Sequence, residues 1–297
     1  MFLNRISLEK AEEKEIMKLF ELMRIRQWYK NLVIFLPMIF AKAIGIIGIE
    51  KTLFGLLSLC LISSANYIIN DVIDINQDRK NPEKRIRPIA SGAVKIPQAL
   101  VMAIAFIMLS LIIASFLSKN FLICMSLIFI LTLIYSLWLK REAFADVIVV
   151  STNFVIRAVS GAFIINVRVS PWLILCPFFL ALFLAIGKRE SEFKLMKDKA
   201  YQHRTNLKMY TPALTKTFTG ISAALLIISY ALYSFLSTYP QLIFTLPIAI
   251  YIIFRYLYLI ETGSEIARHP ERIYKDVRIV IAGIILLAMI FLLVYLI

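Results

Sequence analysis

Four side chains that suit a hard metal ion recur at helical spacing in the first third of the chain. Asn70, Asp74 and Asp78 are four residues apart, and Asp71 lies three residues before Asp74. On a continuing helix all four share one face. Carboxylates on one face repel each other unless a cation lies among them, and their oxygens suit Mg²⁺, whose coordination is usually completed by water and substrate phosphates. The spacing therefore predicts a catalytic magnesium site.

Basic residues follow these carboxylates at once, at Lys84, Arg85 and Arg87. Arginine and lysine donate charge-assisted hydrogen bonds to phosphate oxygens. Carboxylates followed by bases at a membrane edge therefore predict a site for a magnesium-bound diphosphate. The alternative is that these charges only cap a transmembrane helix and anchor it at the membrane surface.

A second polar group lies inside an apolar stretch. Asp146, Asn153 and Arg157 are separated by seven and four residues, which places them on one helical face, and Gly161 continues that face. Placing the charged side chain of an arginine this deep in lipid costs free energy, so Arg157 is predicted to have a function. We predict that it binds a substrate phosphate and that Asp146 and Asn153 support it. The alternative is a structural ion pair with an aspartate of the first group. Glycine at position 161 would permit close helix approach.

Polar residues before the first carboxylate extend the predicted site into the membrane. Asn66 lies one turn before Asn70, with Tyr67 beside it. Because a buried amide is costly in lipid, this face must look into the protein or a cavity. Asn66 and Tyr67 are therefore predicted supporting residues, as is Tyr135 near the end of a later apolar run.

Two further groups of residues are predicted to reach substrate phosphates. Lys188 and Arg189, with Glu192 as an additional acid, are expected in a loop that follows the apolar run at 171–187. The alternative for this loop is a polybasic stripe on anionic lipid. Near the start of the chain, Lys30 and Asn31 are predicted to contact a phosphate from the membrane edge, unless the stretch only anchors the chain at the interface.

The elements that must position these residues are transmembrane helices. Hydrophobic residues make up 60% of the 297 residues, and the mean hydropathy is +0.81, outside the range of soluble globular proteins. Apolar runs of about 17 to 25 residues recur along the chain, as a bilayer requires. We therefore predict an all-α polytopic membrane protein with a single domain over residues 1–297. The nine predicted spans are 31–49, 52–70, 97–116, 121–139, 144–165, 171–187, 213–236, 240–259 and 279–297.

Residues 1–30, before the first span, are predicted to lie in the membrane interface. Ile16, Leu19, Phe20 and Met23 follow helical spacing, and charged residues fill the opposite face. An amphipathic helix of this kind lies along the membrane surface with its apolar face in the lipid.

The net charge of +14 is explained by membrane topology, so no nucleic-acid partner is expected. With the N-terminus inside, 28 Lys and Arg residues fall on the cytoplasmic side and four on the outer side. This predicts a plasma-membrane protein with a cytoplasmic N-terminus and site and an outer C-terminus. The three cysteines lie in apolar runs, and His203 and His269 are isolated, which argues against zinc or haem.

The motifs resemble the UbiA-type intramembrane prenyltransferase superfamily, whose members have nine transmembrane helices. Its first aspartate-rich signature, NDxxDxxxD, matches Asn70 to Asp78, and the Arg-Pro-x-x-Ser-Gly stretch that follows matches Arg87 to Gly92. The resemblance implies a UbiA-type helical bundle with a cytoplasm-facing, Mg²⁺-dependent active site.

Within this superfamily the chain is more similar to the branch of decaprenyl-phosphate phosphoribosyltransferases. The similarity rests on Arg26 to Asn31, Asn81 to Gly92, Asp146 to Arg157, Lys188-Arg189 with Glu192, and Arg255-Tyr256 with Asp276. Aromatic-acceptor members carry a second DxxxD-like motif after the sixth span, where this chain reads Lys-Arg-Glu-Ser-Glu. A basic replacement suits a donor with an additional phosphate, such as phosphoribosyl pyrophosphate.

The resemblance implies transfer of 5-phosphoribosyl from phosphoribosyl pyrophosphate to a polyprenyl phosphate, in cell-envelope biosynthesis. The alternative within the fold is transfer of a prenyl group from its diphosphate to an aromatic acceptor. A transporter or channel would also bury such charges, but corresponding broken spans in two halves are not visible in the sequence. The oligomeric state is left open, and a homo-oligomer is one option.

Overall fold

The computed structural model describes residues 18–196 and 210–296, and these residues are predominantly helical. They fall into two compact units, one within Met1–Leu32 and Leu53–Leu137 and the other within Val33–Thr52 and Trp138–Ile297. Eight of the described helices are long and apolar enough to cross a membrane. The all-α polytopic prediction is thereby confirmed, whereas the prediction of a single domain stays a prediction.

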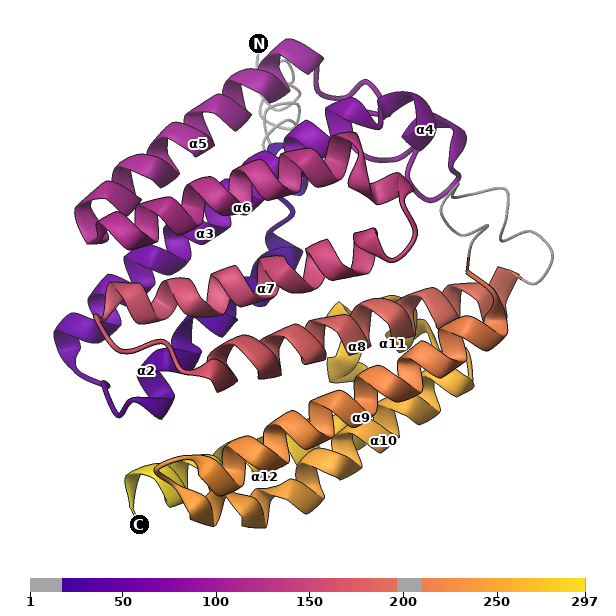
Figure 1. The fold of residues 1–297 in the computed structure, drawn as a ribbon. Coiled ribbons are helices and arrows are strands. Elements are labelled where there is room, and N and C mark those ends of the chain that lie inside the picture. The colour runs from indigo at the N-terminus through magenta and orange to yellow at the C-terminus, as the bar shows by residue number, and fades with distance from the viewer. Residues whose placement is uncertain (1–17, 197–209, 297) are drawn as a thin grey trace, which may run out of the picture. The chain divides into compact units, whose positions relative to one another are not determined.

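The long helices of the first unit are α3 (Ile46–Ile73), which begins in the second unit, α5 (Ile96–Leu117) and α6 (Lys119–Leu137), with the short α4 (Ile75–Lys80) after α3. Helices α5 and α6 run side by side as a hairpin (Figure 1). The chain reverses between α5 and α6 at Ser118, whose backbone is extended. The hydroxyl of Ser118 accepts a hydrogen bond from the backbone amide of Phe121 at 3.1 Å and so caps α6.

Helices α3 and α5 are joined by a buried serine pair. The hydroxyl of Ser58 on α3 and that of Ser110 on α5 lie 2.9 Å apart, and each donates to the carbonyl of the other residue. Both residues are fully buried. Small polar residues of this kind let transmembrane helices approach closely and hydrogen-bond to each other. Around Ala65 and Ile68 of α3, small and aliphatic residues of α5 complete the packing.

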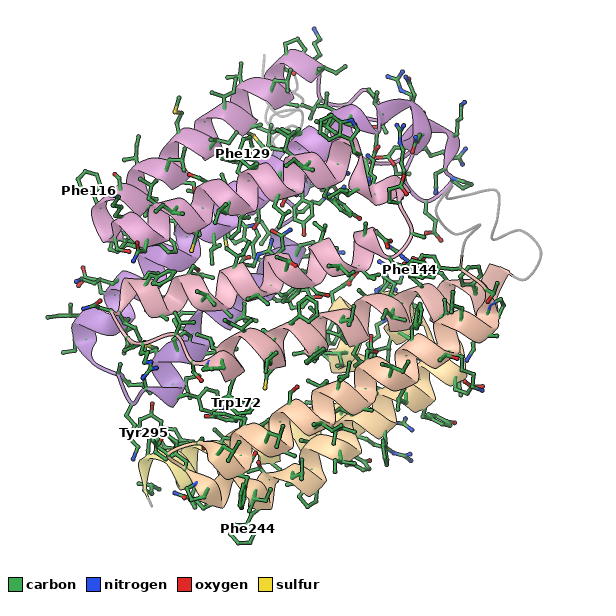
Figure 2. The ribbon with its side chains drawn as sticks, in the orientation of Figure 1. Phe116, Phe129, Phe144, Trp172, Phe244 and Tyr295 are labelled. Atoms are coloured by element: carbon green, nitrogen blue, oxygen red, sulfur yellow. The ribbon has the colours of Figure 1, made fainter. Side chains whose placement is uncertain are left out.

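The second unit contains the remaining helices, namely α2 (Leu36–Phe40), α7 (Ala145–Ile164), α8 (Pro171–Met196), α9 (Pro212–Leu236), α10 (Leu246–Glu261), α11 (Glu265–Arg268) and α12 (Val277–Tyr295). Short 3-10 helices are η1 (Ile25–Phe35), which begins in the first unit, η2 (Leu139–Arg141), η5 (Pro240–Thr245) and η6 (Pro270–Lys275). Helix α8 packs between α7 and α9, and α10 packs on α8, α9 and α12 (Figure 1). Figure 2 shows Phe244 of η5 projecting outward, and its side chain is 69% exposed, as a lipid-facing residue would be.

The predicted close approach at Gly161 is confirmed. An added Cβ at this position would lie 2.1 Å from the carbonyl oxygen of Ile34. The neighbour is therefore the backbone of η1, and only glycine leaves room for it.

The predicted first span, 31–49, is not a single helix. It comprises the end of η1, the five residues of α2, a turn, and the start of α3. Pro37 lies in the first turn of α2, which ends at Phe40. Two residues later the backbone of Lys42 adopts a positive φ of 50°, which a right-handed helix does not allow.

The predicted interfacial helix is described only in part. Residues 18–23 are helical, and Leu19 and Phe20 are exposed, whereas Leu22 is buried. Ile16 lies outside the described residues, and so does His203 of the segment after α8. Placement of this helix in the membrane interface stays a prediction.

Candidate active site

The carboxylates of the first unit lie where α3 ends and α4 begins. Asp74 separates the two helices, but the amide of Asp74 donates to the carbonyl of Asn70 at 2.9 Å, and the amide of Asp78 donates to that of Asp74 at 2.8 Å. The helical spacing predicted from the sequence is thus kept across the junction. Asp71 and Asp78 are only 3% and 2% exposed, whereas Asn70 and Asp74 are partly exposed.

The guanidinium of Arg87 bridges the two buried carboxylates. Its Nη1 donates to Oδ1 of Asp71 at 3.0 Å and to Oδ2 of Asp78 at 2.7 Å. The ammonium of Lys84 lies 3.7 Å from the other oxygen of Asp78. Two of the three predicted bases therefore contact the predicted metal ligands, while Arg85 is exposed to solvent. Buried carboxylates need such partners, because an uncompensated buried charge is strongly unfavourable.

Arg24 is a site residue that the sequence analysis did not predict. Its Nη2 forms an ion pair with Oδ1 of Asp71, and its guanidinium lies 4.9 Å from the centre of the Tyr67 ring. The backbone of Arg24 has a positive φ of 50°, at the end of the helical residues 18–23. The sequence feature that could have identified Arg24 is its place two residues before the Arg26 to Asn31 motif. Tyr67, predicted as a supporting residue, therefore lies beside the carboxylates.

Asn31 and Trp28 hold the N-terminal segment against α3. The side-chain amide of Asn31 donates to Sγ of Cys60 at 3.2 Å and accepts from Ser63 at 3.4 Å. The indole of Trp28 donates to Ser64 at 3.1 Å. Both residues thus have a packing role, and the predicted phosphate contacts of Asn31 and of its neighbour Lys30 stay predictions.

Asn66 offers a donor to the site. The residue is 5% exposed, and its Nδ2 makes no hydrogen bond within the described part of the chain. An unmade hydrogen bond of a buried amide costs about 1–3 kcal/mol. A bound oxygen acceptor would remove this cost, in line with the predicted supporting role. Tyr135 is partly buried near the end of α6 in the same unit.

In the second unit, Asp146 is the centre of a buried network. It is fully buried and accepts hydrogen bonds from Nε and Nη2 of Arg189 at 3.3 and 3.1 Å and from the hydroxyl of Tyr210 at 2.9 Å. Arg189 also donates to Glu192 at 3.3 Å. The structure thus brings together three predicted site residues and joins the start of α7 to the end of α8.

Tyr210 extends this network to the segment before α9. Its hydroxyl accepts the backbone amide of Phe144 at 2.9 Å, and the rings of the two residues meet edge to face (Figure 2 labels Phe144). Burial, followed by the charge of Asp146, raises the pKa of the Tyr210 phenol. The hydroxyl therefore stays protonated at neutral pH and remains a donor to Asp146.

Arg157 and Asn153 lie farther along α7. The guanidinium of Arg157 lies 5.6 Å from the centre of the Phe154 ring on the same helix. The amide of Asn153 donates back to the carbonyl of Val149 at 3.3 Å. The predicted phosphate contact of Arg157 stays a prediction.

The residues from Lys188 to Glu192 are helical, which corrects the predicted loop. Helix α8 runs on to Met196, beyond the apolar part of its sequence. Ion pairs between residues three or four apart stabilise this polar end of α8, including Glu190 with Lys194 at 3.0 Å. Lys188 and Arg189 are therefore held on a helix instead of a loop.

Two late residues that carry the family resemblance pair with each other. Arg255 on α10 donates to Oδ2 of Asp276 at 3.1 and 2.8 Å, and the other oxygen of Asp276 accepts the amide of Ile279 and caps α12. Burial raises the pKa of Asp276, but these hydrogen bonds outweigh it and hold the pKa below its ordinary value. The pair has a structural role.

The carboxylate chemistry of the first unit fits a hard divalent cation. Asp71 and Asp78 direct one oxygen each at a single positively charged nitrogen, and oxygen ligands of this kind suit Mg²⁺. Across residues 18–196 and 210–296, no three His, Cys, Asp or Glu side chains are arranged as a metal-binding group. Asp71 and Asp78 are thus paired with basic side chains, and joint coordination of a metal by Asn70, Asp71, Asp74 and Asp78 stays a prediction.

The chain is similar to known membrane transferases. The model of the UbiA prenyltransferase family matches residues 31–270. Decaprenyl-phosphate phosphoribosyltransferase from Mycolicibacterium smegmatis is 33% identical over 222 residues, which are 73% of this chain and 70% of that protein. The protein of the same name from Mycobacterium tuberculosis is 30% identical over 256 residues, which are 84% of this chain and 85% of that protein.

A solved structure supports the fold. A UbiA homologue from Archaeoglobus fulgidus, bound to DMAPP and Mg²⁺, aligns with a TM-score of 0.74 over 94% of this chain and all of that chain. The two sequences are 21% identical. At this identity the likeness shows the arrangement of helices, which agrees with the predicted UbiA-type bundle.

Proposed function

Since the chain belongs to the UbiA prenyltransferase family, we propose that it transfers 5-phosphoribosyl from phosphoribosyl pyrophosphate to a polyprenyl phosphate. The observation that carries the choice of reaction is the similarity to decaprenyl-phosphate phosphoribosyltransferases, at 30–33% identity over 73–84% of the chain. The Lys188-Arg189 pair of α8, at the place where a second acidic motif would favour a prenyl diphosphate donor, supports the same choice.

In the proposed reaction an oxygen of the lipid phosphate attacks the anomeric carbon of the donor, and pyrophosphate leaves. Magnesium, when bound, supplies positive charge that stabilises the departing diphosphate. Asp71 and Asp78, with Asn70 and Asp74, are the proposed ligands of this cation. Arg87, Lys84 and Arg24 surround these carboxylates and would donate to the diphosphate oxygens.

No general base is required from the chain. A phosphate monoester has its second pKa near 6 and is mostly ionised at neutral pH, so its oxygen is already a nucleophile. This agrees with the composition of the site, whose contacts involve carboxylates, arginines and lysine. The protein's tasks are then to position the two phosphate-bearing substrates and to stabilise the leaving group.

Further phosphate contacts are proposed for Lys30, Asn31, Arg85, Arg157 and Lys188. Arg189 already donates to Asp146 and Glu192, so we propose that it fixes the orientation of the α8 turn that bears Lys188. Any phosphate contact of Arg189 would be additional to these bonds.

The chain is a multi-pass membrane protein, and we propose that it lies in the plasma membrane with its active site facing the cytoplasm. The excess of Lys and Arg in the predicted cytoplasmic segments supports this orientation. The soluble, highly charged donor would then enter from the cytoplasm, and the polyprenyl tail would remain in the bilayer.

A donor test on the purified protein checks the proposed function. One reaction receives phosphoribosyl pyrophosphate, a polyprenyl phosphate and Mg²⁺, and a second receives a prenyl diphosphate, 4-hydroxybenzoate and Mg²⁺. Mass spectrometry should detect a phosphoribosylated lipid in the first reaction, and EDTA should abolish it. A prenylated aromatic in the second reaction alone would replace this function with prenyl transfer.

A further inference from the structure

Arg87 occupies the point on which two predicted metal ligands converge. A single nitrogen of its guanidinium lies 3.0 Å from Oδ1 of Asp71 and 2.7 Å from Oδ2 of Asp78. Both carboxylates are almost fully buried. Two carboxylates that share a buried site repel each other unless a cation lies between them. In this structure an arginine is that cation.

We infer that Arg87 is a resident counter-ion that makes metal binding depend on the arrival of an anionic substrate. The inference rests on the proposed function, in which a metal and a diphosphate bind at these carboxylates. A metal ion coordinated by the same two oxygens would have to take the position of Nη1. Arg87 must therefore move before the metal can bind there.

The charges around the carboxylates explain why an anion is needed for this exchange. Arg24, Lys84 and Arg87 contribute three positive charges within ion-pair distance of Asp71 and Asp78. With Asp74 included, the group is neutral before any metal binds. A divalent cation alone would leave an excess of two positive charges in a partly buried place, which is unfavourable. A diphosphate removes this excess.

The diphosphate also gives Arg87 another place to bind. A guanidinium presents its donors in a planar fork that matches phosphate oxygens, so Arg87 can exchange two carboxylates for a phosphate. Metal and anion then bind together, each raising the affinity for the other by the same factor. Arg87 is a positioning residue for the metal and, once displaced, a ligand of the diphosphate.

Mn²⁺ binding tests this inference without any reaction. The affinity of the purified full-length protein for Mn²⁺ is measured by electron paramagnetic resonance, with and without inorganic pyrophosphate. The wild type should bind Mn²⁺ weakly alone and at least about tenfold more tightly with pyrophosphate, a difference of about 1.4 kcal/mol. Arg87→Gln should bind Mn²⁺ alone about tenfold more tightly than the wild type, and pyrophosphate should then increase its affinity less.

Lys80→Gln is the matched control, because it removes the same charge from an exposed side chain two residues after Asp78. It should change the affinity for Mn²⁺ alone by less than about twofold, since exposed charges act through water and are screened. If both variants raise the affinity equally, the position of Arg87 is irrelevant and the inference is overturned. Tight binding of Mn²⁺ alone to the wild type overturns it too, while leaving the proposed function intact.

Absence of Mn²⁺ binding under both conditions would overturn the proposed metal site together with this inference. Should Arg87→Gln fail to fold, Arg87→Lys replaces it. A lysine keeps the charge but ends in one compact ammonium and loses the planar fork. Arg87→Lys should therefore bind Mn²⁺ alone as weakly as the wild type but gain less affinity from pyrophosphate, and tight binding of Mn²⁺ alone would contradict the inference.

Discussion

At the scale of single residues, the ion pairs of Asp71 and Asp78 with Arg24, Lys84 and Arg87 set the charge of the site. The spacing of Asp71, Asp74 and Asp78 is visible in the chain because a helical repeat links residues that are close in sequence. The contact of Arg87 with both carboxylates depends on how the segment after α4 folds back, and no periodicity encodes it. Arg24 reaches Asp71 from 47 residues away, through a backbone conformation that is uncommon for arginine.

Asp78→Asn should lower the rate of phosphoribosyl transfer by about 100-fold or more, because loss of one charged ligand weakens stabilisation of the leaving diphosphate. The rate of lipid product formation at saturating Mg²⁺ measures this effect. Glu83→Gln is the control, since Glu83 is an exposed acid five residues away. Comparable rates for both variants would remove Asp78 from the metal site.

At the scale of helices, apolar runs predict the spanning segments well, because lipid imposes helical structure and a minimum length. The ends of the helices are less predictable. Helix α8 continues through Lys188 to Glu192 although the sequence there is polar, since ion pairs along the helix and the contact of Arg189 with Asp146 hold it. The sequence analysis placed Asp146 and Arg189 in the site separately, and only the fold shows that they form a pair.

Asp146→Asn should destabilise the protein by about 3 kcal/mol or more, because it leaves the guanidinium of Arg189 buried without its main counter-charge. Thermal unfolding of the purified protein in detergent measures the change. Glu142→Gln, at an exposed position four residues earlier, should change the stability by less than about 0.5 kcal/mol. If the two variants unfold at the same temperature, the Asp146–Arg189 pair does not join α7 to α8 as described.

Gly161→Ala should lower the melting temperature, because its Cβ would meet the backbone carbonyl of Ile34 at 2.1 Å. Overpacking of this kind costs about 1–3 kcal/mol. Gly220→Ala on α9 is the matched control, since a Cβ there meets nothing within 4 Å. Alanine at 220 should be neutral or slightly stabilising within a helix. Equal melting temperatures for the two variants would show that η1 does not pack closely against α7.

At the scale of the whole molecule, the number of membrane crossings is the property that the sequence and the structure describe differently. The sequence predicts nine spans, whereas eight described helices reach the required length. The predicted span without a single long helix is 31–49, and η1 and α2 cover its first half. Eleven residues of 3-10 helix and five of α-helix nevertheless extend about 30 Å when aligned, which matches the thickness of a bilayer core.

We therefore expect residues 25–40 to cross the membrane and the two termini to lie on opposite sides. Lys42 should then be accessible from the outside and Lys84 from the cytoplasm. Single cysteines at these two positions, labelled in intact cells with a membrane-impermeant maleimide, measure this in a chain whose three native cysteines are replaced by serine. Labelling of position 42 but not of 84 is predicted. Labelling of neither, or of both, would contradict a crossing by η1 and α2.

The central claim, phosphoribosyl transfer to a lipid phosphate, is tested most directly by a competition in one vessel. Purified protein in lipid vesicles receives Mg²⁺, phosphoribosyl pyrophosphate, a polyprenyl phosphate, a prenyl diphosphate and 4-hydroxybenzoate at equal concentrations, and mass spectrometry quantifies both products. The account predicts a phosphoribosylated lipid, with one pyrophosphate released for each molecule formed, and no prenylated aromatic. A prenylated aromatic as the main product would contradict it.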